Sequence, residues 1–203
     1  MAAALPLRRA VVEDDTRAAV TGALGARPGC VAGIGTGSFF ARQDEDRLRV
    51  IGGHGLVLGD EASGAWLGRE LLSRALRSLD GMEPATPLLD ALLREMGGKP
   101  GVIAFAARAA PRDFGRLAPR ILEAAPDDTA AASLMREGAG HVAAALAPLG
   151  WQDALPLCLI GGLGPAYADW LPAKMRAALR PPEGTALDGA LALARAMPQR
   201  QSG

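Results

Sequence analysis

A turn with the sequence Gly35-Thr36-Gly37-Ser38 follows a short apolar segment and could bind a phosphate group. Glycine lets backbone amides approach an anion closely, and a Thr or Ser hydroxyl adds a hydrogen-bond donor. The same residues also suit a tight hairpin turn that binds nothing. The turn by itself therefore leaves both interpretations open.

A second glycine-rich segment, residues 52–55, contains three glycines and His54, and it is followed by Gly59-Asp60-Glu61-Ala62-Ser63-Gly64. A loop without side chains exposes backbone donors and acceptors to a polyhydroxylated ligand. Asp60 or Ser63 would also suit the N-cap of the helix that follows. Capping does not explain the upstream glycines, so a binding loop and a simple cap both remain open.

A third glycine-rich turn, residues 161–164, ends an apolar segment that reads as a buried strand and precedes a predicted helix. Open α/β sheets bind ligands at such strand ends, where exposed backbone can lie against a base or a ribose. The glycine spacing differs from the dinucleotide fingerprint, and no Gly-Lys-Ser/Thr follows as in a P-loop.

The acidic pair Asp14-Asp15 precedes a predicted helix. Phosphoryl transfer to an alcohol needs a carboxylate that orients the hydroxyl and accepts its proton. Asp15 is placed for that role, although an aspartate before a helix also serves as an N-cap.

Composition narrows the class of protein. The 203 residues carry 22 basic and 22 acidic side chains, and no basic stripe indicates nucleic-acid binding. His54 and His141 lie far in sequence from Cys30 and Cys158, which argues against a zinc site, and we expect no protein-built metal site. Two cysteines in apolar segments, no secretory signal and no apolar run long enough to span a bilayer predict a cytoplasmic protein that does not bind membranes.

The sequence pattern predicts an α/β fold that is rich in helices toward the C-terminus. We expect strands at 8–13, 30–34, 39–41, 48–51 and 155–160. We expect helices at 16–24, 63–79, 86–96, 112–125, 128–147, 166–179 and 186–196. Residues 102–107 fit a strand or a helix equally well.

The order of these motifs resembles that of the BadF/BadG/BcrA/BcrD-type ATPase family, and within it the N-acetylglucosamine and glucosamine kinase branch. The resemblance covers residues 12–196 and is carried by Asp15, Gly22-Ala23 and four segments. These segments are GTGS, GGHGLVLGDEASGAWLGRELL, LIGGLG and PPEGTALDGALALA. It implies a ribonuclease H-like lobe of the actin-like ATPase and sugar kinase superfamily.

The resemblance also implies roles for individual residues. Asp15 matches the catalytic aspartate, which acts on the 6-hydroxyl of an amino sugar. The residues matching the sugar site are Ser38, Gly53, His54, Gly55 and Asp60, and those matching the ATP site are Thr36, Gly37, Gly161, Gly162 and Ala190. ATP and Mg²⁺ are the implied cofactors, with the metal held through phosphates and water.

Two departures from the family pattern stand out. Family members commonly carry Trp where this chain has His54, which affects the expected sugar preference. Residues 1–11 contain no Asp-Gly-Gly-Gly-Thr-Lys type hairpin, which grips the β- and γ-phosphates in the family. We therefore expect residues 1–203 to be a single domain, mainly the C-terminal lobe, without the N-terminal phosphate-binding lobe. Such a chain would be weakly active or inactive alone, and its apolar lobe surface would favour a homodimer.

Two other functions remain open from sequence alone. A non-catalytic module that binds a sugar or a nucleotide would also need no phosphate-gripping hairpin. An ATP-dependent activator of a 2-hydroxyacyl-CoA dehydratase is less well supported, because Cys30 and Cys158 lie in apolar strands rather than where such activators hold an iron–sulfur cluster between subunits.

Overall fold

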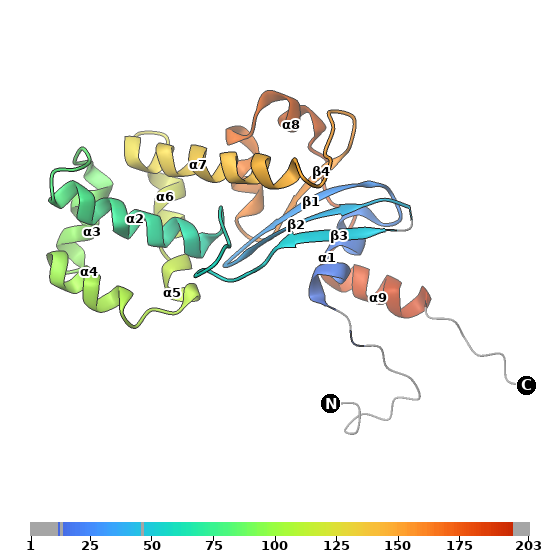
Figure 1. The fold of residues 1–203 in the computed structure, drawn as a ribbon, viewed down its shortest axis with the longest axis horizontal. Helices are drawn as coiled ribbons and strands as arrows, with labels where there is room; N and C mark the ends of the chain where they lie inside the picture. Colours follow the sequence, from blue (N-terminus) through green and yellow to red (C-terminus); the bar gives the residue numbers. More distant parts are fainter. Residues whose placement is uncertain (1–11, 13, 46, 197–203) are drawn as a thin grey trace, which may run out of the picture.

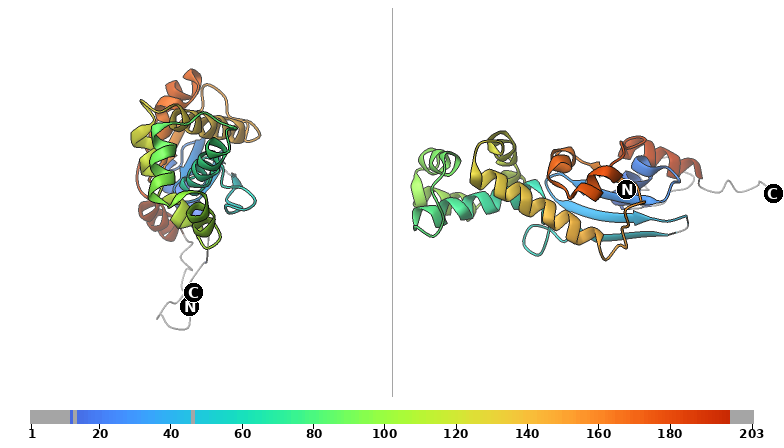
Figure 2. Two further views of the ribbon diagram at one scale, coloured as in Figure 1. Left: turned by 90° about the vertical axis from the view of Figure 1, so that its left-hand side faces the viewer. Right: turned by 90° about the horizontal axis from the view of Figure 1, so that it is seen from above.

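The computed structural model describes residue 12, residues 14–45 and residues 47–196. The strand predicted at 8–13 lies, apart from residue 12, outside the described residues. The molecule is elongated, with a sheet at one end and a group of helices at the other (Figures 1 and 2).

The sheet has four strands in the order β3-β2-β1-β4. Their bounds are Gly29–Ile34 for β1, Ser38–Gln43 for β2, Leu48–Gly52 for β3 and Leu157–Ile160 for β4. Strands β1, β2 and β3 form an antiparallel meander, and β4 joins β1 in parallel after a long helical connection. The predicted strands 30–34, 39–41, 48–51 and 155–160 are thus confirmed, with small shifts at their ends.

Helices cover the sheet on both faces (Figure 1). Helices α1 (Asp15–Leu24) and α9 (Ala186–Ala196) lie on one face, where Val31 and Cys158 belong to a small core. On the other face α7 (Thr129–Leu146) and the 3₁₀ helix η2 (Gly164–Trp170) enclose the main core, which includes Cys30. Every residue of β1 is buried, because this strand is covered from both sides.

A helical part separates β3 from β4 in the sequence. It consists of α2 (Gly64–Leu79), α3 (Pro87–Glu95), α4 (Gly98–Ala106), α5 (Pro111–Gly115), α6 (Ala118–Ala124) and α7. Residues 102–107, which fitted two structures in sequence, are mainly helical. Within the described residues, no helix combines the length and apolar character needed to cross a bilayer.

Two predicted helices are each divided in the structure. The helix expected at 112–125 is two short helices, because Pro119 in the first turn of α6 has no backbone N–H to continue an earlier helix. The helix expected at 166–179 is η2 followed by α8 (Ala173–Ala178), which meet at Pro172. The helix at 186–196 matches α9.

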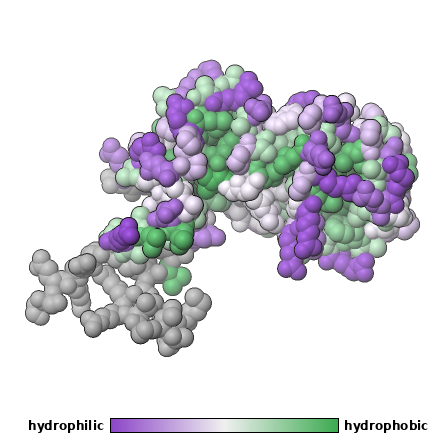
Figure 3. Space-filling model, turned by 180° about the vertical axis from the view of Figure 1, so that it is seen from behind, coloured by the Kyte–Doolittle hydropathy of each residue, from purple (hydrophilic) through white to green (hydrophobic). Residues whose placement is uncertain are grey.

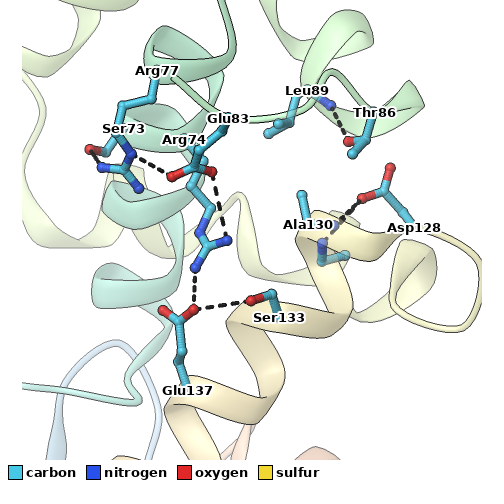
Figure 4. Close-up of polar contacts among 11 residues, drawn as sticks. Ser73, Arg74, Arg77, Glu83, Thr86, Leu89, Asp128, Ala130, Ser133 and Glu137 are labelled. Atoms are coloured by element: carbon cyan, nitrogen blue, oxygen red, sulfur yellow. Dashed lines mark hydrogen bonds and ion pairs between the residues drawn. The ribbon is translucent and has the colours of Figure 1, made fainter. Parts of the chain in front are cut away.

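Charged side chains connect the helices of the helical part (Figure 4). Arg74 of α2 forms ion pairs with Glu137 of α7 and with Glu83, and Arg77 bonds Glu83 at 2.5 Å. Asp128 caps α7 by accepting from two backbone amides of its first turn, and it also accepts from Leu88 of α3 at 3.0 Å. Polar side chains therefore fix the relative positions of α2, α3 and α7.

Helices α1 and α9 pack closely because each carries a glycine at the crossing. A Cβ atom at Gly22 would overlap the Thr185 carbonyl, and one at Gly189 would overlap the backbone of Ala18 and Gly22. The start of α9 is fixed by Asp188, whose carboxylate accepts from the backbone N–H and the hydroxyl of Thr185. These hydrogen bonds lower the pKa of Asp188.

Candidate functional site

The Gly35–Ser38 turn joins β1 to β2, as a hairpin turn would, and it also separates two cavities. The sheet-end cavity has a volume of about 610 Å³ and contacts α1, both sheet-end turns and the segment before α9. The helix-side cavity has a volume of about 360 Å³ and lies between the same turn and α6. Gly35 and Thr36 line both cavities, while Gly161 lines the first and Gly162 the second.

At two positions beside these cavities, the fold does not require glycine. Neither Gly35 nor Gly162 has φ in the left-handed range, and a Cβ atom at either position would meet no atom within 4 Å. Both residues line the helix-side cavity, so an added side chain would project into open space beside or within that cavity. Gly161 differs, because its φ is +82° and a Cβ there would overlap the end of β1. The glycine-rich turn thus combines one structural glycine with one that leaves the cavity open.

The N-terminus of α2 is fastened to the Gly35–Ser38 turn. The amide of Gly64 donates to the carbonyl of Gly35 at 2.8 Å, and that of Ala65 donates to Thr36 at 3.1 Å. Ser63 is the N-cap of α2 and accepts from Trp66 at 3.0 Å. The first amides of α2 therefore hold the turn in place, and the cap is Ser63 rather than Asp60.

Asp60 faces the turn from the opposite loop. Only 8% of the residue is exposed, and a Cβ atom on Gly37 would lie 2.9 Å from its carboxylate oxygen Oδ2. Its other oxygen accepts from the amide of Gly55 at 3.3 Å. Asp60 is therefore not a cap, and its buried carboxylate lies at the junction of the two glycine-rich segments, between Gly55 and Gly37.

Ser38 and His54 occupy different environments near Asp60. The Ser38 hydroxyl is buried and donates to the carbonyl of Glu61 at 2.7 Å, so it supports the loop that carries Asp60. Gly53, His54 and Gly55 are exposed at the end of β3, and a Cβ atom at Gly53 or Gly55 would meet nothing within 4 Å.

Asp15 begins α1 and is exposed, while Asp14 is the N-cap and accepts from the amide of Thr16 at 2.8 Å. Hydrogen bonds from the Thr16 side chain and backbone lower the pKa of Asp14. Ala19, four residues after Asp15 and hence on the same side of α1, lines the sheet-end cavity. Asp15 is therefore free of capping and lies one turn from that cavity.

Of the predicted site residues, four line the two cavities: Thr36, Gly37, Gly161 and Gly162. The residues Asp15, Ser38, Gly53, His54, Gly55 and Asp60 line neither cavity, although Asp60 lies against Gly37. Ala190 is exposed on α9 and lines neither of the two cavities; Ala186, one turn earlier, lines the sheet-end cavity. Sequence reasoning missed the wall of the helix-side cavity formed by Gly115, Ala118, Pro119 and Leu122. These residues lie in short helices without a motif, so only their packing reveals them.

The two cavities are electrically neutral, because no charged side chain is among the residues that line them. Among the described residues, no group of three His, Cys, Asp or Glu side chains could hold a metal ion. Cys30 and Cys158 are free and buried on opposite faces of the sheet, and burial raises the pKa of the Cys30 thiol to about 11. Such thiols do not fit a cluster shared between subunits.

On the face shown in Figure 3, apolar side chains are concentrated in the middle, between the sheet and the helical part, and hydrophilic side chains lie on either side. The helix-side cavity lies at this junction, since its walls come from the sheet-end turns and from α6.

Comparisons with known proteins identify relatives of this chain. The chain is 29% identical over 196 residues to glucosamine kinase GspK of Vibrio cholerae, covering 96% of this chain and 67% of that protein. A 71-residue segment, 34% of this chain, is 37% identical to an N-acetylmuramic acid/N-acetylglucosamine kinase of Clostridium acetobutylicum and covers 23% of it. No family model matches the chain.

Solved structures show the same fold. A protein assigned as an N-acetylglucosamine kinase from Chromobacterium violaceum superposes with a TM-score of 0.81 at 40% identity. The match covers 88% of this chain and 64% of that one, so the chain spans less than two thirds of this relative. A second structure, from Porphyromonas gingivalis, has a TM-score of 0.67 at 24% identity over 86% of this chain and 62% of that one, and it supports the fold alone.

The mixed sheet, its helical layers and these structural neighbours define an α/β protein of the actin-like ATPase and sugar kinase superfamily. Within that superfamily the named relatives are glucosamine and N-acetylglucosamine kinases. They support the N-acetylglucosamine and glucosamine kinase branch of the BadF/BadG/BcrA/BcrD-type ATPase family, which the motif order predicted. The dehydratase-activator alternative is not favoured.

Proposed function

We propose that this chain takes part in the ATP-dependent phosphorylation of an amino sugar, glucosamine or N-acetylglucosamine, at its 6-hydroxyl. The named relatives at 29% and 40% identity support a kinase of this type. Because the chain spans 67% and 64% of those two relatives, the activity of the whole protein is part of the proposal.

The observation that carries the proposal is the position of the Gly35–Ser38 turn. It lies between two cavities, and the carboxylate of Asp60 stands against its Gly37. A phosphoryl group must pass from a nucleotide on one side to a sugar on the other, and a glycine turn between two sites suits that path. The shared turn therefore supports group transfer better than it supports binding of a single ligand.

The helix-side cavity fits a nucleoside. Its walls are apolar at Pro119 and Leu122, and its floor is bare backbone at Gly35 and Gly162. ATP bound there would place its phosphates at Thr36 and Gly37. Since no charged side chain lines the cavities, Mg²⁺ held by phosphates and water would neutralise the transferring group.

In the proposed reaction, Gly53, His54, Gly55 and Asp60 hold the sugar, and the carboxylate of Asp15 orients the 6-hydroxyl. As the 6-oxygen forms its bond to the γ-phosphorus, the bond from that phosphorus to the β,γ-bridging oxygen breaks and ADP leaves. The hydroxyl proton passes to Asp15, which acts as a general base. Ser38 contributes indirectly, because its hydroxyl supports the loop that carries Asp60.

Titration calorimetry tests the proposal directly. Residues 1–203 should bind a non-hydrolysable ATP analogue with Mg²⁺, and separately glucosamine or N-acetylglucosamine. A coupled ADP-release assay with each sugar then measures turnover, which we expect to be weak for this chain by itself. The proposal would be contradicted if the chain bound neither sugar, or if it did not bind the nucleotide analogue.

That residues 1–203 form one domain, mainly the C-terminal lobe of a two-lobed kinase, stays a prediction, as does a homodimer. Size-exclusion chromatography with light scattering would test the dimer. A mass of one chain, 20.8 kDa, would contradict it.

A further inference from the structure

The Asp60–Ser63 turn is held through three successive carbonyl groups. The carbonyl of Asp60 accepts from the amide of Ser63 at 3.0 Å, and that of Glu61 accepts from the Ser38 hydroxyl at 2.7 Å. The carbonyl of Ala62 accepts from the phenol of Tyr167 at 2.8 Å. Two of these hydrogen bonds come from side chains distant in sequence, so the turn is shaped by the rest of the fold.

Such support is needed because the turn is strained. Asp60 has a φ of +58° and Ala62 a φ of +66°, values that residues with a side chain rarely adopt. A strained backbone persists when its surroundings over-determine it, and such sites are often functional. The conformation places the Asp60 carboxylate against Gly37, so keeping the strain also keeps Asp60 in place.

Tyr167 is built into the fold in a way that directs its hydroxyl to this turn. The side chain is fully buried, and it lies on η2 three residues after the Gly161–Gly164 turn. Gly138 of α7 makes room for it, because a Cβ atom there would approach the Tyr167 ring to 2.7 Å. Burial raises the pKa of the Tyr167 phenol, so the hydroxyl keeps its proton and can donate.

We propose that Tyr167 is a positioning residue, whose hydroxyl holds the Asp60–Ser63 turn so that Asp60 is set to bind a sugar hydroxyl. This inference rests on the proposed function and adds a residue to it that contacts neither ligand. It also links the two sites physically, because η2 follows directly from the turn that borders the nucleotide cavity. The hydroxyl of Tyr167, rather than its aromatic ring, holds the Asp60–Ser63 turn in position.

The test is the variant Tyr167→Phe, which removes the hydroxyl and keeps the ring. Calorimetry should show glucosamine or N-acetylglucosamine binding weakened about five- to tenfold, the size expected for loss of one hydrogen bond. Binding of the ATP analogue with Mg²⁺ should change by less than about twofold, within the scatter expected for an untouched contact.

Thr86→Val is the matched control. It removes a buried hydroxyl that caps α3 in the helical part and keeps the side-chain shape. It should lower the melting temperature as Tyr167→Phe does but leave sugar affinity unchanged. A loss of sugar affinity in Tyr167→Phe that Thr86→Val reproduces would assign Tyr167 to general stability and overturn the proposal.

A second variant moves the Tyr167 hydroxyl instead of removing it. Gly138→Ala keeps the phenol but displaces it from α7, and it should weaken sugar binding in the same selective way. Hydrogen exchange on both variants should accelerate at the amides of Gly55, Ser63, Gly64 and Ala65, while the amides of the four strands stay unchanged.

The outcomes separate the two proposals. If the wild-type chain binds neither sugar, the proposed function fails and the positioning claim falls with it. If the wild type binds a sugar and Tyr167→Phe binds it equally well, or if exchange at the turn does not change, the positioning claim alone is overturned.

Discussion

The sheet end and the helical part of this chain are held together by different means. At the sheet end, glycine-rich turns meet through backbone amides and buried hydroxyls, and the cavity walls carry no charge. In the helical part, Arg74, Glu83, Glu137 and Asp128 join the helices through charged side chains (Figure 4). The difference indicates that the glycine-rich turns are shaped to leave space for ligands, whereas α2, α3 and α7 are joined into a support behind them.

The largest effect should follow from Asp15→Asn at the sheet end. Loss of the proton acceptor should lower turnover about a thousandfold while sugar affinity stays nearly unchanged, since an amide can still contact the hydroxyl. The matched control is Asp14→Asn, which keeps a good N-cap for α1. Steady-state kinetics and calorimetry on both variants provide the measurement. Unchanged turnover in Asp15→Asn would place the base elsewhere.

Gly162→Val should affect binding and not folding. The Cβ atom of the new side chain would have no protein atom within 4 Å, so the substitution causes no clash. The side chain would project toward the helix-side cavity, and nucleotide affinity should therefore fall about tenfold or more. The melting temperature should stay within a few degrees of the wild type. Nucleotide affinity that survives the substitution would remove the helix-side cavity as the nucleoside site.

Asp128→Ala should affect folding and not binding. It removes the N-cap of α7 and the contact with α3, and it should cost about 1–2 kcal/mol in the free energy of unfolding, measured by urea denaturation. Ligand affinities should not change. Altered sugar or nucleotide binding in this variant would contradict the division of roles between the two regions.

The pH dependence of this effect has a defined sign. Burial alone would raise the pKa of Asp128, but hydrogen bonds from Leu88, Ala131, Thr86 and Ala130 lower it below the ordinary value. A carboxylate with a lowered pKa contributes stability above the ordinary pKa of aspartate and loses it as the pH falls. The stability difference between wild type and Asp128→Ala should therefore shrink below about pH 4. A constant difference would mean that the charge contributes nothing.

The smallest effect is expected for Gly140→Ala. Gly140 lies inside α7 and is exposed, and a Cβ atom added there would have no other atom within 4 Å. Alanine should raise the free energy of unfolding by about 0.5–1 kcal/mol through helix propensity. The same measurement by urea denaturation checks it, and a destabilised variant would show that α7 is constrained at this position in a way its packing does not explain.

The sequence predicts the sheet end better than the helical part. Glycines after apolar segments predict the turns Gly35–Ser38 and Gly161–Gly164, and residues of both turns line the sheet-end cavity. The sequence could not decide between cap and site for Asp60, because the answer depends on Ser63 taking the cap. It also missed Tyr167 and the α6 wall, since a buried tyrosine and a short helix such as α6 carry no motif and acquire meaning only through packing.

Hydrogen-exchange mapping of both ligands on the wild-type chain tests the central claim most directly. The ATP analogue with Mg²⁺ should protect residues 35–38 and 161–163, and the amino sugar should protect 53–60 and again 35–38. Footprints that overlap at the Gly35–Ser38 turn would support a shared hub for group transfer. Footprints that never meet at this turn, or protection of the helical part alone, would contradict it.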